Sequence, residues 1–491
     1  MFRKSFIPLS SKEQSRELDR QAASWNLTGE FLMENAGRVS ATEASRLFPS
    51  RSFLILCGSG NNGGDGWVMA RYLRELGKSV SVFSTESLSE LSKRNGDQAI
   101  KMGVPSHPLQ ELCAEDLKNQ IVVDALFGVG LSRPVEGVFA QAISLVNASK
   151  EAVISLDIPS GLCGNTGQIL GEAVKADHTF SYGLGKPGFY IGKGPGLAGQ
   201  IQVFPIGFPD ELLSKVCDTF FLVEKNTVSL PVYEDEANKS HRGHTLICAG
   251  REGFWGSGIL ACQGAFIAGS GYVTWAGQGL PDIIKIPEVL TVNIKDSKIL
   301  YKKTSVAIGP GIGIEKSVGD LIRLLKDQDQ PVVLDADALT FLSQNTSLFP
   351  LNFHFVLTPH TGELSRILAV SSEEIGRDRL RFAREGAKQT GSWIVLKGFH
   401  TVVSDGNKCW IVNSGNSALG KAGTGDVLTG LIAGFLAQGL SVRDGALLAV
   451  AAHGETAEEW CRSGRDVNSF SASEALRLLP SVLFKMRQNA G

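Results

Sequence analysis

Short apolar runs, each ending near a glycine or an aspartate, divide the chain and alternate with helix-like segments. The first is Ser52–Cys57, SFLILC, and the next four lie at Val80–Phe83, Ile121–Asp124, Ala152–Leu156 and His178–Tyr182. Buried strands that alternate with helices are typical of an α/β domain with a mostly parallel sheet. We therefore predict an α/β fold with helices on both faces of the sheet, and ligands at the carboxyl ends of the strands.

The alternation stops in a polar stretch, Glu211–Ser240, and then resumes. The second series comprises Thr245–Cys248, Gly258–Ala268, Ser305–Ile308, Pro331–Leu334, His354–Leu357 and Trp393–Leu396. A hairpin is predicted around Asp405-Gly406, before two final helices at Thr424–Ala437 and Val442–Cys461. We predict two domains, residues 1–220 and 221–491. The first 50 residues are predicted to be helical, beginning with a capping box of Ser10 and Glu13.

Composition excludes several classes of protein. The chain has 48 Lys plus Arg and 50 Asp plus Glu, a balance that argues against a nucleic-acid binder. The longest apolar stretch, Val427–Leu440, is too short to span a membrane, and the N-terminus lacks the apolar core of a signal peptide. Eight scattered cysteines without a C-x-x-C pair indicate reduced thiols. We expect a cytoplasmic protein with no nucleic-acid or membrane partner.

The glycine cluster after the first strand suggests a phosphate site. Gly58, Gly60 and Gly63 satisfy G-x-G-x-x-G, a dinucleotide signature that is weak alone and is also compatible with a structural turn. The insert NNGGD adds two amides and a carboxylate, which suggests further polar or cation contacts. Asp124 and Asp157 follow two later strands. Each aspartate could cap its own turn, but three polar loops at successive strand ends favour one shared site.

A second candidate site lies at AGTGD, residues 422–426. Small residues before an apolar helix leave backbone N–H groups free to bind an anion, and Asp426 stands beside them as a possible base. The alternative is that Asp426 only stabilises the helix dipole. Residues 415–421 match G-x-x-x-x-G-K, but Ala422 replaces the required Ser or Thr, so we reject a P-loop. His241 and His244 have H-x-x-H spacing but no clustered acid, and we expect no zinc there.

Several motifs in order resemble one known family. They are GSGNNGGDG, VDALFGVGLSRP, SLDIPSG and YGLGKPG, followed by GPGIG, DADAL, TPHTGE, LKGFHT and AGTGD. Together they are similar to the bifunctional NAD(P)H-hydrate repair enzymes, over about residues 10–485. The resemblance implies a Rossmann-like αβα epimerase domain and a ribokinase-like αβα dehydratase domain. Such enzymes interconvert the R and S hydrates NADHX and NADPHX, then phosphorylate the S form at C6 and eliminate phosphate.

For the first domain, the resemblance implies two groups of residues that bind the hydrate and one potassium site. Asp157 would bind the hydrate and is the candidate acid–base group, although it could instead serve as a cation or ribose ligand. Potassium would be held by Asn62, Asp124 and Ser160. The remaining hydrate-binding residues would be Asn61, Asn62, Gly63, Gly64, Asp65, Gly128, Val129, Gly130, Leu131, Ser132, Arg133 and Pro134.

For the second domain, the resemblance implies that Asp426 is the catalytic base. The anion hole would be formed by Gly423, Thr424 and Gly425. The hydrate would be bound by Ser257, Gly311, His360 and Asp426, although His360 could instead cap the next helix. The nucleotide would be bound by Lys397, Gly398, Phe399, His400, Thr401 and Gly425. The co-substrate is expected to be ADP, giving AMP and phosphate, with ATP possible and magnesium as cofactor.

The chain departs from the family pattern at Arg251–Gly258, where Trp255 stands in a loop that is usually rich in Gly and Ala. Lys421 also replaces an uncharged residue, and could contact phosphate or remain solvated. Two other functions stay open at this point. The second domain could be a small-molecule kinase of ribokinase type, and the first could be a nucleotide-sensing module without activity. A homo-oligomer is expected.

Overall fold

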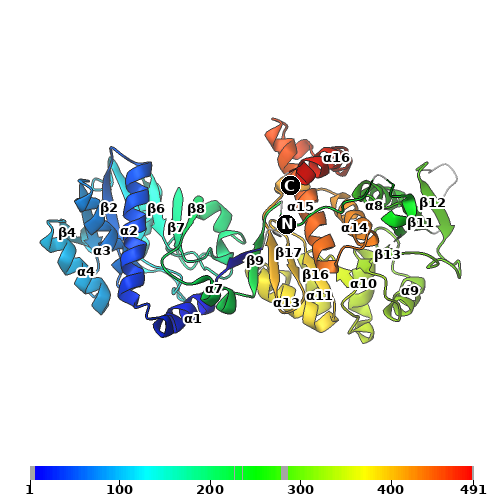
Figure 1. Ribbon diagram of the computed structural model, residues 1–491, viewed down its shortest axis with the longest axis horizontal. Coiled ribbons are helices and arrows are strands. Elements are labelled where there is room, and N and C mark those ends of the chain that lie inside the picture. Colours follow the sequence, from blue (N-terminus) through cyan, green and yellow to red (C-terminus); the bar gives the residue numbers. More distant parts are fainter. Residues whose placement is uncertain (1–5, 226, 235, 278–285, 489–491) are drawn as a thin grey trace. The chain divides into compact units, whose positions relative to one another are not determined.

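The computed structural model describes residues 6–225, 227–234, 236–277 and 286–488. The chain folds into two compact units (Figure 1). One comprises Pro8–Phe220, and the other comprises the chain from Phe221 onward together with the residues that precede Pro8. The chain therefore passes between the units twice, within strands β1 (Ile7–Leu9) and β9 (Phe220–Val223).

The N-terminal unit contains a seven-stranded parallel sheet in the order β4-β3-β2-β5-β6-β7-β8. Its strands are β2 (Ser52–Cys57), β3 (Val80–Ser84), β4 (Ser106–Pro108), β5 (Gln120–Ala125), β6 (Val153–Leu156), β7 (His178–Tyr182) and β8 (Gln200–Phe204). The strand order reverses between β2 and β5. A reversal of this kind opens a crevice at the carboxyl ends of the two strands.

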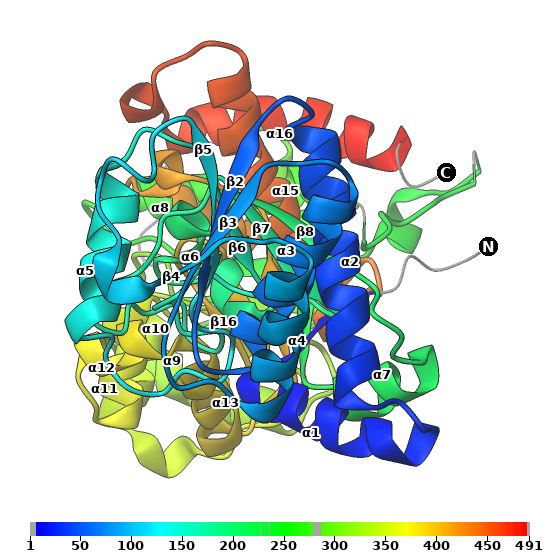
Figure 2. The same cartoon turned by 90° about the vertical axis from the view of Figure 1, so that its left-hand side faces the viewer.

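Helices cover both faces of this sheet because its strands are apolar on both sides. Figure 2 shows α5 on one face and α2, α3 and α4 on the other. Phe53 and Ile55 pack toward Trp67 of α3, whereas Leu54 and Leu56 pack toward Ile143 of α5. The helices of the unit are α1 (Lys12–Ala22), α2 (Gly29–Leu47), α3 (Asn61–Glu75), α4 (Glu90–Lys101), α5 (Gly137–Ala148), α6 (Gly194–Leu197) and α7 (Asp210–Val216).

The C-terminal unit is built on an eleven-stranded sheet in the order β1-β9-β18-β17-β16-β15-β14-β13-β10-β11-β12. The strands from β10 to β16 run parallel to their neighbours, and β17 and β18 add an antiparallel hairpin. Besides β1 and β9, the strands are β10 (His244–Cys248), β11 (Tyr272–Gly277), β12 (Val289–Asn293), β13 (Ser305–Ile308), β14 (Val332–Leu334), β15 (Phe355–Leu357), β16 (Trp393–Leu396), β17 (Val402–Ser404) and β18 (Cys409–Val412).

The helices of this unit also form two layers. Figure 1 shows α8, α14, α15 and α16 on one side of the sheet and α9, α10, α11 and α13 on the other. Their bounds are α8 (Trp255–Ala268), α9 (Lys316–Lys326), α10 (Asp337–Gln344), α11 (Thr361–Leu368), α12 (Ser372–Arg377), α13 (Arg379–Thr390), α14 (Thr424–Ala437), α15 (Val442–Arg462) and α16 (Ala472–Gln488).

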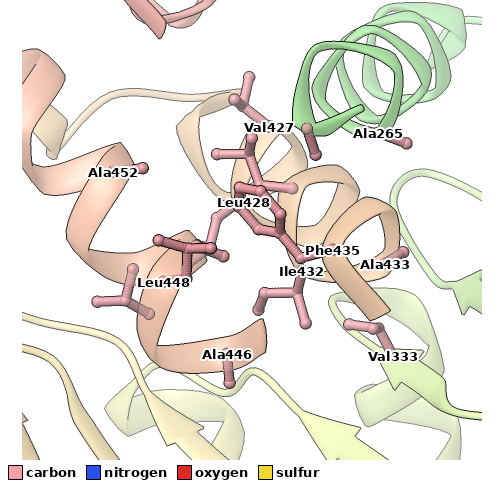
Figure 3. Close-up of a cluster of buried hydrophobic side chains, with 14 of the residues drawn as sticks. Ala265, Val333, Val427, Leu428, Ile432, Ala433, Phe435, Ala446, Leu448 and Ala452 are labelled. Carbon is pink, nitrogen blue, oxygen red and sulfur yellow. The ribbon is translucent and has the colours of Figure 1, made fainter. Parts of the chain in front are cut away.

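Helix α14 is the centre of the C-terminal core. Val427, Leu428, Ile432 and Phe435 are buried among side chains of the neighbouring helices and the sheet, including Val333 of β14 (Figure 3). The helix approaches α8 closely because Gly430 has no side chain. A Cβ atom added to Gly430 would lie 2.0 Å from the carbonyl oxygen of Ala261. This packing holds the N-terminus of α14, which includes the last three residues of AGTGD, against the ends of the strands.

The α/β fold class, with parallel strands covered by helices on both faces, is confirmed. Strand β2 and helix α14 begin and end where the sequence predicts. The capping box is wrong by one residue: Ser11 and Gln14 form it, at 3.2 and 3.1 Å. The reason is that Glu13 instead accepts a hydrogen bond from Asn165, while the backbone of Ser10 donates to Gly185. None of the described helices combines the length and apolarity needed to cross a bilayer.

The close approach of α8 and α14 gives a stability prediction. Gly430→Ala should lower the free energy of unfolding by about 1–3 kcal/mol, because the new methyl group overpacks the contact with Ala261. Gly256→Ala, in the exposed first turn of α8, is the matched control, since an added Cβ meets no atom within 4 Å there. Urea denaturation of both variants checks the prediction. Equal stability of Gly430→Ala and the wild type would show that the helices can separate without loss.

Candidate functional site

The candidate residues of the N-terminal unit gather at the carboxyl ends of β2, β5 and β6. Asn62 follows β2, Asp124 is the second-last residue of β5, and Asp157 comes directly after β6. The predicted loop Asn61–Asp65 is in fact the first turn of α3, because the helix begins immediately after its N-cap, Gly60. Its glycines let this turn lie against the strand: a Cβ on Gly63 would lie 1.9 Å from the Gly58 carbonyl oxygen.

Asn62, Asp124 and Ser160 supply oxygen atoms suited to a hard monovalent cation. Asp124 is fully buried and accepts hydrogen bonds from the hydroxyls of Ser155 at 2.8 Å and Ser160 at 2.5 Å. Both amide atoms of Asn62 are buried and have no hydrogen-bond partner. An orphaned buried amide indicates a missing ligand, since such groups are nearly always paired. Burial raises the pKa of Asp124, and its hydrogen bonds from Ser160 oppose this effect. These three side chains supply the kinds of oxygen donor that potassium prefers, and Ser160 contacts Asp124 directly.

Asp157 lies in a strained backbone conformation and contacts a buried lysine. Its φ angle is +60°, in the left-handed region that few residues other than glycine adopt. One carboxylate oxygen lies 3.2 Å from the Nζ atom of Lys186, and the other accepts a hydrogen bond from the Val129 amide at 2.9 Å. The Lys186 side chain is 3% exposed. The Asp157 carboxylate thus connects the loop after β5 with the segment after β7.

Asp65 is a buried carboxyl group in the same site. Burial raises its pKa well above the usual range, and the nearby carboxylates of Asp157 and Asp19 raise it further. The pKa of Asp19 is also raised by desolvation and by Asp157, and Lys186 lowers it. The site therefore holds three carboxyl groups around one buried ammonium group. At least Asp65 favours its neutral form more strongly than a free aspartate does.

The segment Gly128–Pro134 lies beside Asp157 and is partly exposed. A Cβ on Gly128 would lie 2.9 Å from the Asp157 Oδ2 atom and 3.4 Å from the Asn62 Cβ atom, so these three residues are adjacent. The Nζ atom of Lys12 donates a hydrogen bond of 3.2 Å to the Leu131 carbonyl oxygen. Lys12 thereby ties the segment to helix α1.

In the C-terminal unit, the predicted anion hole is at the N-terminus of α14. Gly423 is the N-cap, has a φ angle of +87°, and provides no capping side chain. The hydroxyl of Thr424 donates to the carbonyl oxygens of Leu419 and Lys421, each at 2.8 Å, and so faces the preceding loop. No side chain caps the first turn of α14, although the Thr424 amide donates a long hydrogen bond of 3.4 Å to the Lys421 carbonyl oxygen. The helix dipole favours an anion there.

Asp426 lies in the first turn of α14 and is partly buried. Desolvation raises its pKa to about 6, Asp335 and Asp337 add to this effect, and a hydrogen bond with Ser257 and the charge of Lys397 oppose it. Such a carboxyl group is mostly ionised at neutral pH but holds a proton more tightly than a free aspartate. A group of this kind suits a general base.

Lys397 connects the ends of three neighbouring strands. Its Nζ atom lies 2.7 Å from an Asp335 oxygen and 3.7 Å from a Glu363 oxygen. The second oxygen of Asp335 accepts a hydrogen bond from Thr429 of α14 at 2.7 Å. Desolvation lowers the pKa of Lys397, but the two carboxylates outweigh it and the net pKa is raised. A Cβ on Gly425 would lie 3.6 Å from Nζ, which places the ammonium group beside the anion hole.

Ser257 and Gly311, which are both predicted to bind the hydrate, lie next to each other, and Ser257 contacts Asp426. Ser257 is hydrogen-bonded to Asp426, and a Cβ on Gly311 would lie 3.3 Å from the Ser257 Cβ atom. His360 caps α11, as its alternative interpretation predicted. Its Nδ1 atom accepts from the Gly362 amide at 2.9 Å, and Glu363 closes the capping box. Because Nδ1 is used in this cap, a contact between His360 and the substrate would have to be made by its Nε2 atom.

The remaining nucleotide-binding candidates form the loop between β16 and β17. Phe399 is half exposed, and its ring stacks on His400 with centroids 4.1 Å apart. Thr401 is buried, and its hydroxyl donates to the Gly398 carbonyl oxygen at 3.2 Å. The loop begins at Lys397, so the ion pair with Asp335 fixes one of its ends.

Several side chains at these sites were quoted within motifs but not assigned a role. Lys186 lies in YGLGKPG, Asp335 and Asp337 in DADAL, and Glu363 in TPHTGE. The acids follow strands, a signal that was used for Asp124 and Asp157 and could have found them too. The residues that hold the loops from a distance, Lys12 and Arg379, carry no local signal.

Two features weighed in the sequence have structural explanations. The Nε2 atom of His244 is 2.7 Å from the Thr274 hydroxyl, and burial lowers the pKa of this histidine to about 4. Within the described part of the chain, no cluster of three or more His, Cys, Asp or Glu side chains could hold a metal. Lys421 donates to the Asn468 carbonyl oxygen at 2.6 Å, so the backbone already binds its ammonium group.

Both units are similar to known proteins. Residues 29–188 match the family described as YjeF-related protein N-terminus, and residues 245–478 match NAD(P)H-hydrate dehydratase. A bifunctional NAD(P)H-hydrate repair enzyme of Thermofilum pendens is 35% identical, over 96% of this chain and 95% of its own length. One of Leishmania infantum is 31% identical, over 94% and 91%. The ADP/ATP-dependent NAD(P)H-hydrate dehydratase of Bacillus subtilis, co-crystallised with ATP/Mg2+, is 32% identical, covers 52% of this chain and 95% of its own, and has a TM-score of 0.48.

The sites and the fold define an enzyme with two α/β units, each with acidic groups at the carboxyl ends of parallel strands. The chain belongs to the family of bifunctional NAD(P)H-hydrate repair enzymes, in which an epimerase domain is joined to an ADP/ATP-dependent dehydratase domain. The resemblance found in the sequence is thereby confirmed.

The raised pKa of Asp65 predicts a pH-dependent gain in stability from its removal. A carboxyl group whose pKa is raised on folding costs stability once the pH exceeds its unfolded value, and the cost grows until the folded pKa is passed. Asp65→Asn should therefore raise the melting temperature at pH 8, and the gain should vanish as the pH falls toward 4. Thermal unfolding at pH 8 and pH 4 measures this difference. A gain that is equal at both pH values would contradict the assignment.

Proposed function

We propose that the protein restores hydrated nicotinamide cofactors in two steps. The N-terminal unit interconverts the R and S forms of NADHX and NADPHX, and the C-terminal unit converts the S form to NADH or NADPH. ADP is the proposed co-substrate, with ATP as the alternative. The observation that carries this proposal is the arrangement of Asp426, Lys397 and the uncapped N-terminus of α14 at one place.

In the proposed dehydratase reaction, the oxygen of the C6 hydroxyl attacks the β-phosphorus of ADP, and Asp426 takes the proton of that hydroxyl. The bond from that phosphorus to the AMP oxygen breaks, and AMP leaves. The C6–O bond then breaks as phosphate leaves, and C5 loses a proton to the departing phosphate, which restores the C5–C6 double bond. Backbone N–H groups of Gly423, Thr424 and Gly425 stabilise the charge on the transferred phosphoryl group.

Lys397 is proposed to bind the nucleotide phosphate opposite the anion hole, because its ammonium group lies beside Gly425. The loop Lys397–Thr401 and Gly425 would hold the nucleotide, while Ser257, Gly311, His360 and Asp426 hold the hydrate. Both oxygens of Asp335 are occupied by Lys397 and Thr429. We therefore propose that magnesium enters the site bound to the nucleotide phosphates, as is common for this ion.

In the proposed epimerase reaction, Asp157 is the acid–base group for the inversion of configuration at C6. The substrate lies between the first turn of α3, Asn61–Asp65, and the segment Gly128–Pro134. Asn62, Asp124 and Ser160 would hold potassium, which would fix the two segments by gathering their oxygen atoms. The support for Asp157 is its contact with buried Lys186 and its strained backbone, a feature that clusters at functional sites.

Two further expectations belong to the same proposal. The enzyme is proposed to act in the cytosol, because its eight cysteines are free thiols in the structure and lack the pairing of a secreted protein. A homo-oligomer is also proposed, and size-exclusion chromatography with light scattering measures it directly.

Asp426→Asn should abolish the dehydratase reaction and leave the epimerase reaction intact. The loss should be about 10²- to 10⁴-fold, since the proton acceptor is removed. Recovery of absorbance at 340 nm from the S hydrate, with magnesium and ADP or ATP in turn, measures it. Asp444→Asn is the matched control, because Asp444 also lies in the first turn of a helix, α15. A stable phosphorylated product without recovery of NADH would instead indicate a kinase.

The pKa of Asp426 also predicts the acid limb of the wild-type dehydratase. The base must be ionised, so the rate should fall about tenfold per pH unit below about 6. The same 340 nm assay from pH 5 to pH 8, corrected for reaction without enzyme, checks this. A rate that stays constant down to pH 5 would exclude Asp426 as the base.

Asp157→Asn should stop epimerisation without affecting the dehydratase. Exchange between the R and S hydrates, followed by chromatography after the spontaneous rate is subtracted, should fall about 10²-fold or more. Asp177→Asn is the control, since Asp177 also accepts a backbone hydrogen bond, from Val153 at 2.8 Å, but precedes β7. Unchanged exchange in Asp157→Asn would favour a role in binding or folding alone.

A further inference from the structure

Arg379, the first residue of α13, binds the loop between β16 and β17 through three backbone carbonyl groups. Its Nη1 atom donates to the carbonyl oxygens of Phe399 at 2.7 Å and His400 at 3.2 Å, and its Nη2 atom donates to that of Leu396 at 3.0 Å. These acceptors span the loop Lys397–Thr401. The planar guanidinium group donates in fixed directions, so it specifies the positions of these carbonyls relative to one another.

In the described structure, the guanidinium charge of Arg379 interacts with these carbonyl groups and not with a carboxylate. Among the described residues, no carboxylate lies within ion-pair distance of Arg379, whereas the nearby Arg377 and Arg381 pair with Glu373 and Glu385. Desolvation by the surrounding protein lowers the pKa of Arg379 to about 10, so it remains charged at neutral pH. Hydrogen bonds from a charged donor are stronger than neutral ones. The cost of desolvating the cation is thus offset by the carbonyl groups of the loop.

The loop in turn is shaped to admit the guanidinium group. Gly398 has a φ angle of +155°, and a Cβ added there would lie 2.8 Å from the Nη2 atom of Arg379. His400 has a φ angle of +50°, also in the left-handed region. These conformations cost energy for residues with side chains and persist only when their surroundings hold them. The loop therefore depends on Arg379 as much as Arg379 depends on the loop.

We propose that Arg379 is a positioning residue that fixes the loop Lys397–Thr401 in its nucleotide-binding conformation before the nucleotide arrives. This inference rests on the proposed function, which assigns ADP or ATP binding to that loop. A preorganised loop loses less conformational entropy on binding. Loss of Arg379 should therefore weaken nucleotide binding, while the KM for the hydrate and the epimerase reaction stay unchanged.

The test measures Mg·ADP binding by calorimetry and the KM and kcat of the dehydratase for ADP. Arg379→Met keeps the aliphatic stem and removes the donors, and we expect its Kd and KM for ADP to rise about tenfold or more, with a smaller change in kcat. Arg379→Lys keeps one charged donor and should give an intermediate Kd. Arg381→Met is the matched control on the same helix, because Arg381 pairs only with exposed Glu385 in the described structure, and its Kd should stay within about twofold of wild type.

A second variant keeps the inference testable if Arg379→Met does not fold. Gly398→Ala places a methyl group against the guanidinium group and should raise the Kd for Mg·ADP in the same way. Hydrogen exchange at the amides of residues 398–400 should also become faster in both variants, and a purely structural loss elsewhere would not produce that local change. An unchanged Kd in either folded variant would overturn the inference.

The same measurements separate this inference from the proposed function. A wild-type protein that binds Mg·ADP with the expected dependence on Arg379 but restores no absorbance at 340 nm would overturn the proposed reaction and support the role of Arg379. Normal turnover by a folded Arg379→Met variant with a wild-type KM for ADP would support the proposed reaction and overturn the role of Arg379.

Discussion

The C-terminal unit depends on the ammonium group of Lys397, whose side chain is 22% exposed and whose two carboxylate partners are buried. Asp335 follows β14, Glu363 lies in α11 after β15, and Lys397 follows β16, so their contacts tie three neighbouring strands together at their carboxyl ends. Removing one partner of a buried ion pair typically costs about 3–5 kcal/mol, because the other charge is left without compensation. The same ammonium group lies beside Gly425, where the phosphate is proposed to bind. The group that holds the strand ends together is therefore also the one best placed for phosphoryl transfer, and the site cannot be altered there without altering the fold.

The N-terminal unit follows the same physical rule with different residues. Lys186 is buried against Asp157, and it donates three further hydrogen bonds, to Ser181, Tyr182 and Leu184. In each unit a basic residue on the first turn of a helix also binds a loop through backbone carbonyl groups. Lys12 binds Leu131 in one, and Arg379 binds Leu396, Phe399 and His400 in the other. The two loops, one proposed to bind the hydrate and the other ADP, are thus held by contacts to their backbone, which leaves their own side chains available for the ligand.

The sequence predicted many of the strands because they depend on local patterns, although it missed buried β11. Ser52–Cys57 and Trp393–Leu396 are apolar on both sides, as central parallel strands must be, and Asp124, Asp157 and Asp426 follow from strand ends or a helix start. Edge strands were missed: β8 and β12 are partly exposed and lack that apolar signal. Lys12 and Arg379 were missed because their partners are backbone atoms 119 and up to 21 residues away. A contact between a side chain and a backbone carbonyl group leaves no recognisable pattern in the sequence, because every residue has such a group. The shift of the capping box from Ser10 to Ser11 has a similar cause, since distant Asn165 and Gly185 decide it.

The two sites handle protons differently, and the difference suits the two proposed reactions. The dehydratase removes a proton from the hydroxyl in one direction, for which a single carboxylate with a pKa of about 6 is sufficient at neutral pH. Epimerisation returns to the same covalent state, so any group that gives a proton must recover it within the cycle. The N-terminal site places Asp157, in contact with an ammonium group and a backbone amide, near Asp65, whose pKa is raised by burial and by Asp157 itself. A carboxyl group whose pKa is raised by burial can donate a proton at a pH where a free carboxyl group has already lost it. The N-terminal site therefore places two carboxyl groups near each other for the proposed proton exchange, whereas the C-terminal site places Asp426 alone as the proposed acceptor of the hydroxyl proton.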